Sequence, residues 1–60
     1  MAMPSVNSTE AAVLCVYNAV MGGLAKATAS VRRDLDDAVT ATVTAYTVGE
    51  LIRIDVKPEL

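Results

Sequence analysis

The sequence predicts a small α+β fold, in which one long N-terminal helix over about residues 8–36 is followed by a β-hairpin. Apolar residues recur every three or four positions through the first half of the chain, which is the spacing of a buried helix face. After about residue 38, apolar and polar residues alternate at every second position, which is typical of a half-buried strand. A second alternating run follows Gly49 closely, as the return strand of a hairpin does.

The chain is expected to form one small domain over residues 1–60, with an irregular lead-in at residues 1–7. A domain of this size buries only about 60% of its unfolded surface. Asn7 is the predicted N-cap of the helix, because Glu10 three residues later can complete a capping box. Glu10 also places negative charge in the first turn, where the helix dipole favours it.

The predicted helix has an apolar stripe with the alternating three-and-four spacing of a face that packs on a core. The Gly22-Gly23 pair is its weak point, since each glycine costs about 1 kcal/mol relative to alanine in a helix interior. We expect the helix to continue, because a regular spacing of small residues runs through these glycines. The apolar stripe consists of Leu14, Tyr17, Met21, Leu24, Thr28, Val31 and Leu35.

A second helical stripe consists only of small residues, which recur at every fourth position. Such a row makes a shallow groove along a helix, so that another backbone can approach closely. We therefore predict that this stripe is a helix–helix contact between copies of the chain. Its members are Ala11, Cys15, Ala19, Gly23 and Ala27.

The hairpin is predicted to have strands at about residues 39–47 and 51–57, with a four-residue connection that contains Gly49. Pro58 ends the second strand, because proline cannot donate to the ladder. One register separates apolar from polar residues at every step. In this register Ala45 faces Ile52, Val43 faces Ile54 and Ala41 faces Val56, while on the other sheet face Thr44 meets Arg53, Thr42 meets Asp55 and Thr40 meets Lys57.

An alternative interpretation extends the helix to about residue 46 and leaves only a short C-terminal strand, which gives a mostly α fold. In this interpretation Gly49 is a helix C-cap, and a coiled coil is the natural assembly. The residues that fit this longer helical face are Leu35, Ala38, Val39, Thr42, Val43 and Tyr46.

The reactive side chains are few, and they predict neither an enzyme nor a cofactor or metal site. With one cysteine and no histidine, the chain lacks an intramolecular disulfide and the usual transition-metal ligands. Cys15 has no histidine to activate it and is interpreted as a packing residue. Asp34, Asp36 and Asp37 lack the spacing of a calcium loop and are interpreted as a solvated turn that ends the helix.

The charge pattern excludes a basic nucleic-acid surface, and the hydropathy pattern argues against a membrane span. The net charge is −2, and Arg32 and Arg33 are followed at once by aspartates. The longest uncharged, mostly apolar run covers residues 11–25, whereas a transmembrane helix needs about 20 apolar residues. No basic segment precedes an apolar stretch, as it would in a secretory signal. We expect a cytoplasmic location, or a place within a virion or filament.

The composition predicts a homo-oligomer. Apolar residues make up 53% of a chain that is too small to bury them all, and Phe and Trp are absent. We interpret the chain as a non-enzymatic, self-assembling structural or assembly subunit of a filament, ring, shell or virion. It is expected to form homo-oligomers through the small-residue helix stripe and the edges of the hairpin. The alternative is a small oligomeric binding module that holds a ligand or a protein partner at a subunit interface. The predicted interface residues are Ala11, Cys15, Ala19, Gly23, Ala27, Thr40, Thr42, Thr44, Ile52, Ile54 and Val56.

Overall fold

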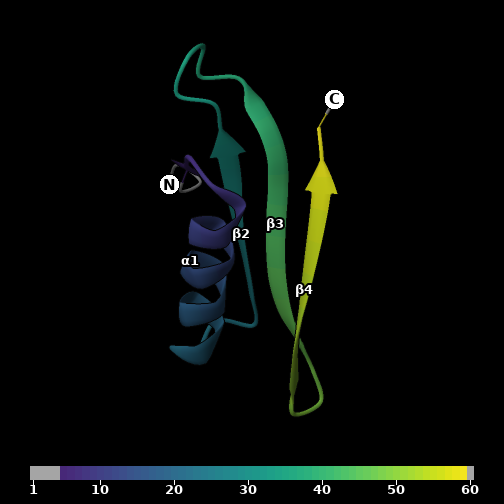
Figure 1. The fold of residues 1–60 in the computed structure, drawn as a ribbon. Helices are drawn as coiled ribbons and strands as arrows, with labels where there is room; N and C mark the ends of the chain where they lie inside the picture. The colour runs from purple at the N-terminus through teal and green to yellow at the C-terminus, as the bar shows by residue number, and fades with distance from the viewer. Residues whose placement is uncertain (1–4, 60) are drawn as a thin grey trace.

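The computed structural model describes residues 5–59, and within this range the chain forms one helix and a mixed sheet (Figure 1). The α+β class predicted from the sequence is therefore confirmed. A strand before the helix and another directly after it were not predicted. The elements are β1 (Ser5–Val6), α1 (Thr9–Met21), β2 (Lys26–Arg32), β3 (Val39–Val48) and β4 (Leu51–Pro58).

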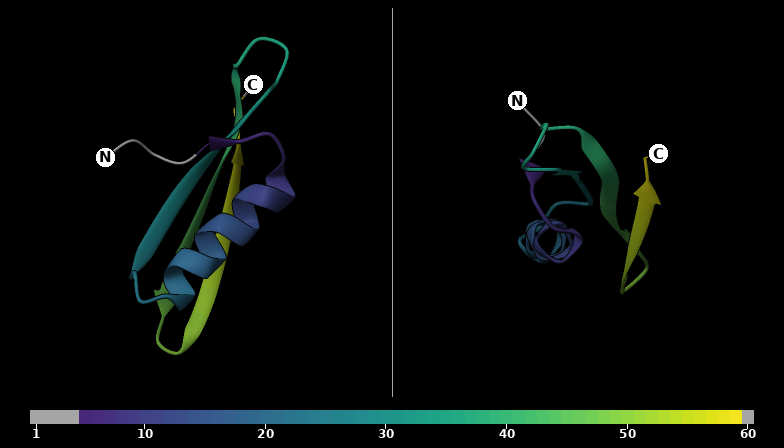
Figure 2. Two further views of the ribbon diagram at one scale, coloured as in Figure 1. Left: turned by 90° about the vertical axis from the view of Figure 1, so that its left-hand side faces the viewer. Right: turned by 45° about the horizontal axis from the view of Figure 1, so that its top comes forward.

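The described strands form a four-stranded sheet in the order β1-β2-β3-β4. β1 is parallel to β2, and α1 is the crossover that joins them. β2, β3 and β4 follow one another as an antiparallel meander. α1 lies along one face of the sheet, where it packs mainly on β2 and β3 (Figure 2).

The helix begins one residue later than predicted. Ser8 is the N-cap, with its backbone in the extended region, and its Oγ accepts a hydrogen bond from the Ala11 N–H at 3.1 Å. Asn7 instead donates from its side-chain amide to an Asp34 carboxylate oxygen at 3.3 Å. Glu10 lies in the first turn, as predicted.

The helix ends at Met21, so the predicted helix over residues 8–36 is wrong beyond that point. Leu24 N–H donates to the Ala19 carbonyl at 3.2 Å and Gly23 N–H to the Val20 carbonyl at 3.0 Å, which is the Schellman pattern of a helix C-terminus. Gly23 has a φ of 120°, a conformation that glycine adopts without the steric cost of a Cβ. The glycine pair is therefore a stop signal, because Gly23 satisfies the last carbonyls in a left-handed turn.

β2 occupies the second half of the predicted helix. Its residues alternate between the two sheet faces, with Ala29 opposite Val43 and Thr28 opposite Thr44 on β3. The long-helix alternative is also wrong, since β3 spans Val39–Val48 and pairs on both sides.

The predicted hairpin is confirmed, but its register differs by two residues. Val43 lies opposite Val56 and Ala45 lies opposite Ile54, because the loop contains only Gly49 and Glu50. Gly49 has a φ of 61°, as the first loop position of a type II′ hairpin turn requires. A shift of two residues leaves every side chain on its predicted face, since the side-chain period of a strand is also two.

The core between α1 and the sheet contains only alanine and valine. The predicted apolar stripe of the helix does not face this core, because Leu14, Tyr17 and Met21 point away from the sheet and are exposed. Small residues on β2 and β3 allow a close approach of the helix, which then buries its smaller side chains. The buried apolar residues are Ala12, Val16 and Val20 on α1, Ala29 and Val31 on β2, and Ala41, Val43 and Ala45 on β3.

Candidate functional site

The outer edge of β4 is the first candidate site. β4 is the last of the described strands in the sheet, and β3 is its neighbour on one side only (Figure 1). The Glu59 N–H donates to the Thr40 carbonyl at 2.9 Å, so the odd-numbered positions of this segment direct their backbone groups toward β3. Backbone groups alternate along a strand, so those of Ile52, Ile54 and Val56 point to the outer edge. This row can pair with another strand.

The helix-side face of β4 is apolar and half exposed. Ile54 is 36% exposed and Val56 is 48% exposed, although Ala45 and Val43 directly opposite them are completely buried. The reason is the position of α1, which packs on β2 and β3 and hardly reaches β4 (Figure 2). Only Ile52 among these β4 residues packs against the core. The apolar surface of the sheet thus continues past the helix that should cover it.

The opposite face of β4 is charged. Arg53, Asp55 and Lys57 alternate with the apolar residues and lie opposite Tyr46, Thr44 and Thr42 on β3. The two ion pairs within residues 5–59 join Arg32, at the end of β2, to Asp37 and Arg33 to Asp36 in the loop that follows. The three charged β4 side chains form no ion pair in this range. Their charges remain available to a neighbouring molecule.

A second exposed apolar surface lies on the outer side of α1. Leu14 and Met21 are 56% and 62% exposed, and Tyr17 lies between them on the same side of the helix. Leu24, in the turn that follows the helix, is also exposed. No described residue covers this side of the helix.

The predicted small-residue stripe is not continuous in the structure. Ala11, Cys15 and Ala19 share one side of α1 and are partly buried. Gly23 lies in the turn after the helix and Ala27 lies in β2, so these two residues are not on the helix at all. The predicted groove for a second helix is therefore reduced to its first half.

The predicted threonine row lies on β3 and is partly engaged within the chain. The Thr40 hydroxyl donates to the Val31 carbonyl at 3.2 Å, and the Thr44 hydroxyl is 3.3 Å from that of Thr28 on β2. The Thr42 hydroxyl donates to a Glu59 carboxylate oxygen at 3.5 Å. Thr42 and Thr44 alternate with the buried core residues of β3, so they lie on the sheet face away from α1.

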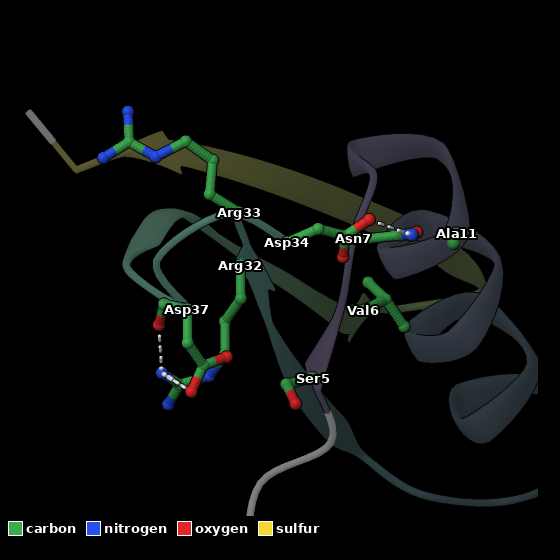
Figure 3. Close-up of a pocket in the computed structure, with 8 residues that line it drawn as sticks. All are labelled: Ser5, Val6, Asn7, Ala11, Arg32, Arg33, Asp34 and Asp37. Carbon is green, nitrogen blue, oxygen red and sulfur yellow. Dashed lines mark hydrogen bonds and ion pairs between the residues drawn. The ribbon is translucent and has the colours of Figure 1, made fainter.

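The β2–β3 loop and the N-terminal segment surround a shallow cavity of about 440 Å³ (Figure 3). The residues that line it come from β1, the start of α1, the end of β2 and the loop. They are Ser5, Val6, Asn7, Ala11, Arg32, Arg33, Asp34 and Asp37.

Both arginines at this cavity already have partners. Arg33 forms a two-bond pair with the Asp36 carboxylate at 3.1 and 2.9 Å, and Arg32 donates to the Asp37 carbonyl at 3.0 Å. The Asp37 carboxylate lies 3.8 Å from the Arg32 guanidinium. The charged run is thus a self-paired strand connection rather than the predicted helix end. It offers little free positive charge to an anionic ligand.

No other chemistry is evident in the described part of the chain. Residues 5–59 hold no group of three or more acidic, cysteine or histidine side chains arranged for a metal ion. No helix within residues 5–59 is long and apolar enough to cross a bilayer. Comparisons with protein-family models, with curated proteins and with solved structures gave no match to this chain. The features of this chain that point to a function are the two exposed apolar surfaces and the β4 edge.

Proposed function

We propose that the chain is a non-enzymatic, self-assembling structural or assembly subunit, which forms homo-oligomers through the edge of its C-terminal hairpin. One observation carries this proposal. Ile54 and Val56 are exposed beside the completely buried Ala45 and Val43, at a strand edge whose outer backbone groups have no described partner.

The small size of the core supports the same proposal. A chain of this length is marginally stable alone, and its buried apolar residues are all alanine or valine. Burial of apolar surface contributes roughly 25 cal/mol per Å², so coverage of the β4 face by a second copy adds stability that the monomer lacks. Because only folded copies can associate, the apparent stability is expected to rise with protein concentration.

The outer side of α1 is a second contact surface in this proposal. Leu14, Tyr17 and Met21 lie on the helix, away from the β4 edge, so contacts there can extend an assembly beyond a pair. A filament, ring, shell or virion component needs two such surfaces. A cytoplasmic location, or a place within such an assembly, fits this role.

Sedimentation equilibrium over a range of concentrations from low micromolar to millimolar tests the proposal. We expect the mean mass of the wild-type chain to rise with concentration, and we expect Ile54→Lys to remain monomeric. Leu35→Lys is the matched control, because Leu35 is 93% exposed at the tip of the β2–β3 loop, away from β4. Far-UV circular dichroism of each variant checks that it folds. A wild-type chain that is folded and strictly monomeric at millimolar concentration would overturn the proposal.

The second candidate function is a small oligomeric module that binds a ligand or a protein partner. The cavity beside Arg32 and Arg33 is the observation that favours it. It is the weaker candidate, because both guanidinium groups are paired with aspartates. Native mass spectrometry separates the two functions, since a stoichiometric small molecule in the purified oligomer supports the binding module.

A further inference from the structure

We infer that β4 pairs antiparallel with β4 of a second copy, with Ile54 of one subunit directly opposite Ile54 of the other. This inference rests on the self-association proposed above and specifies its geometry. A two-fold axis perpendicular to the sheet would pass between the two Ile54 residues, so that both subunits use the same surface.

Charge complementarity selects this register. Arg53 and Asp55 flank Ile54 on the polar face of the strand. With Ile54 at the axis, Arg53 lies opposite Asp55 of the partner subunit, and Asp55 lies opposite Arg53 of the partner subunit. Opposite charges at directly facing positions stabilise an antiparallel pair. Neither side chain has an ion pair within residues 5–59, so both are available for this contact.

The neighbouring symmetric registers are less favourable. An axis at Arg53 places two arginines face to face, and an axis at Asp55 places two aspartates face to face. Like charges at facing positions are destabilising. An axis at Val56 pairs Asp55 with Lys57, but it also places Pro58 opposite Ile54. Proline has no N–H, so that register loses ladder hydrogen bonds on both sides of the axis.

The backbone and the apolar face agree with the same register. The outward backbone groups of Ile52, Ile54 and Val56 would meet their counterparts, because Ile52 lies opposite Val56 of the partner subunit. Pro58 falls at the end of the ladder, where its missing N–H has least effect. The axis keeps both helices on the same side of the joined sheet. The half-exposed Ile54 and Val56 of both subunits are then buried together between those helices.

Charge exchange tests the register. Arg53→Asp and Asp55→Arg should each raise the dimer dissociation constant by roughly tenfold or more, since each turns two attractive contacts into two repulsive ones. A mixture of the two variants should form a heterodimer, because each then meets the opposite charge. The double variant Arg53→Asp/Asp55→Arg should associate as the wild type does. Sedimentation equilibrium of each sample, with circular dichroism to check folding, measures these outcomes.

Cysteine cross-linking gives an independent measurement. In a Cys15→Ser background, Ile54→Cys should form a disulfide-linked dimer, because facing Cα atoms in a hydrogen-bonded pair are about 5.5 Å apart, within disulfide range. Val56→Cys is the matched control and should not, since the two introduced cysteines would be roughly 13 Å apart along the strands.

The failure of this register and the failure of self-association give different results. A wild-type chain that associates, with charge variants that associate equally well and show no heterodimer preference, would overturn the register but leave self-assembly intact. Efficient cross-linking at Val56→Cys and none at Ile54→Cys would also overturn it. A strictly monomeric wild-type chain would overturn both proposals.

Discussion

β3 and β4 are neighbouring strands with similar sequence patterns but different environments. Both alternate apolar and polar residues, and both direct their apolar side chains to the face that carries α1. Val43 on β3 is completely buried, whereas Val56 directly opposite it on β4 is 48% exposed. The strand pattern therefore specifies which face a side chain occupies, and the position of the helix decides whether that face is covered.

The dimensions of a helix explain the difference. A helix with its side chains is about 10–12 Å wide, and neighbouring strands are about 4.8 Å apart, so a single helix covers roughly two strands. α1 lies over β2 and β3, and β4 is left beside it. A meander of this length under one helix leaves an apolar strand at its edge, which is the surface proposed for assembly.

The largest expected effect comes from the same substitution, valine to alanine, made on the covered strand β3 and on the uncovered strand β4. Val43→Ala should lower the free energy of unfolding by about 2–3 kcal/mol, because it leaves a cavity under the helix. Val56→Ala should lower it by less than about 1 kcal/mol at dilute concentration, since Val56 is already half hydrated. Chemical denaturation at low micromolar concentration measures both values. Equal losses at the two positions would contradict the assignment of covered and uncovered strands.

The next largest effect on stability is expected in the turn between α1 and β2. Gly23→Ala should destabilise the fold by about 1–2 kcal/mol, because φ is 120° at this position. Gly22→Ala is the matched control, with an ordinary helical φ of −78°, and should change stability by less than about 0.5 kcal/mol. Thermal unfolding of both variants measures the difference. A tolerated Gly23→Ala would mean that the helix does not end in this left-handed turn.

The start of the helix contributes somewhat less. Ser8→Ala should cost about 1 kcal/mol, because the Ala11 N–H loses the Ser8 hydroxyl that accepts its hydrogen bond. Thr9→Ala, one residue further on, should be nearly neutral, since Thr9 caps no backbone group in the structure. Denaturation of the two variants compares them directly. A larger loss of stability for Thr9→Ala than for Ser8→Ala would mean that Ser8 is not the N-cap.

The smallest effect is expected in the loop that lies away from the helix. Arg33→Gln removes the ion pair with Asp36, and the side chains of both residues are at least half exposed. Exposed pairs of this kind contribute about 0–1 kcal/mol, and salt screens them. We therefore expect a loss below about 0.5 kcal/mol that disappears in concentrated salt. A large loss that persists in salt would mean that the loop supports the fold.

β2, like β1, was not predicted, although the pattern of β2 is visible in the sequence. Residues 26–32 alternate strictly, with Ala27, Ala29 and Val31 on the helix side. Ala27 and Val31 also fit the predicted stripes of a helix, in which residues recur at every third or fourth position. Alanine is moreover the best helix former. A short run of small residues satisfies both periods, so local pattern alone could not separate them. Gly22-Gly23 is the signal that separates them, because this pair ends the helix and does not merely interrupt it.

The face of the helix that is buried could not be predicted from the helix sequence. Its larger apolar residues, Leu14, Tyr17 and Met21, form the more regular stripe, yet Ala12, Val16 and Val20 face the core. The choice depends on the sheet, where Ala29, Ala41 and Ala45 leave room only for a closely packed helix. The predicted interface combined a small-residue helix stripe with the hairpin edges, and only the β4 edge remains a continuous surface in the structure. The charge pattern around Ile54 can be read in the sequence, but it gains meaning only when β4 is known to be an edge.

The sequence by itself determined the hairpin, the place of Gly49 in its connection and the face on which each β3 and β4 side chain lies. These are local properties, and the period of two preserved them even where the predicted register was two residues in error. Only the tertiary structure decided where α1 lies, which of its faces is buried and which strand remains uncovered. Those outcomes depend on the fit between distant segments, because one helix can cover about two strands and the shape of the sheet decides which two.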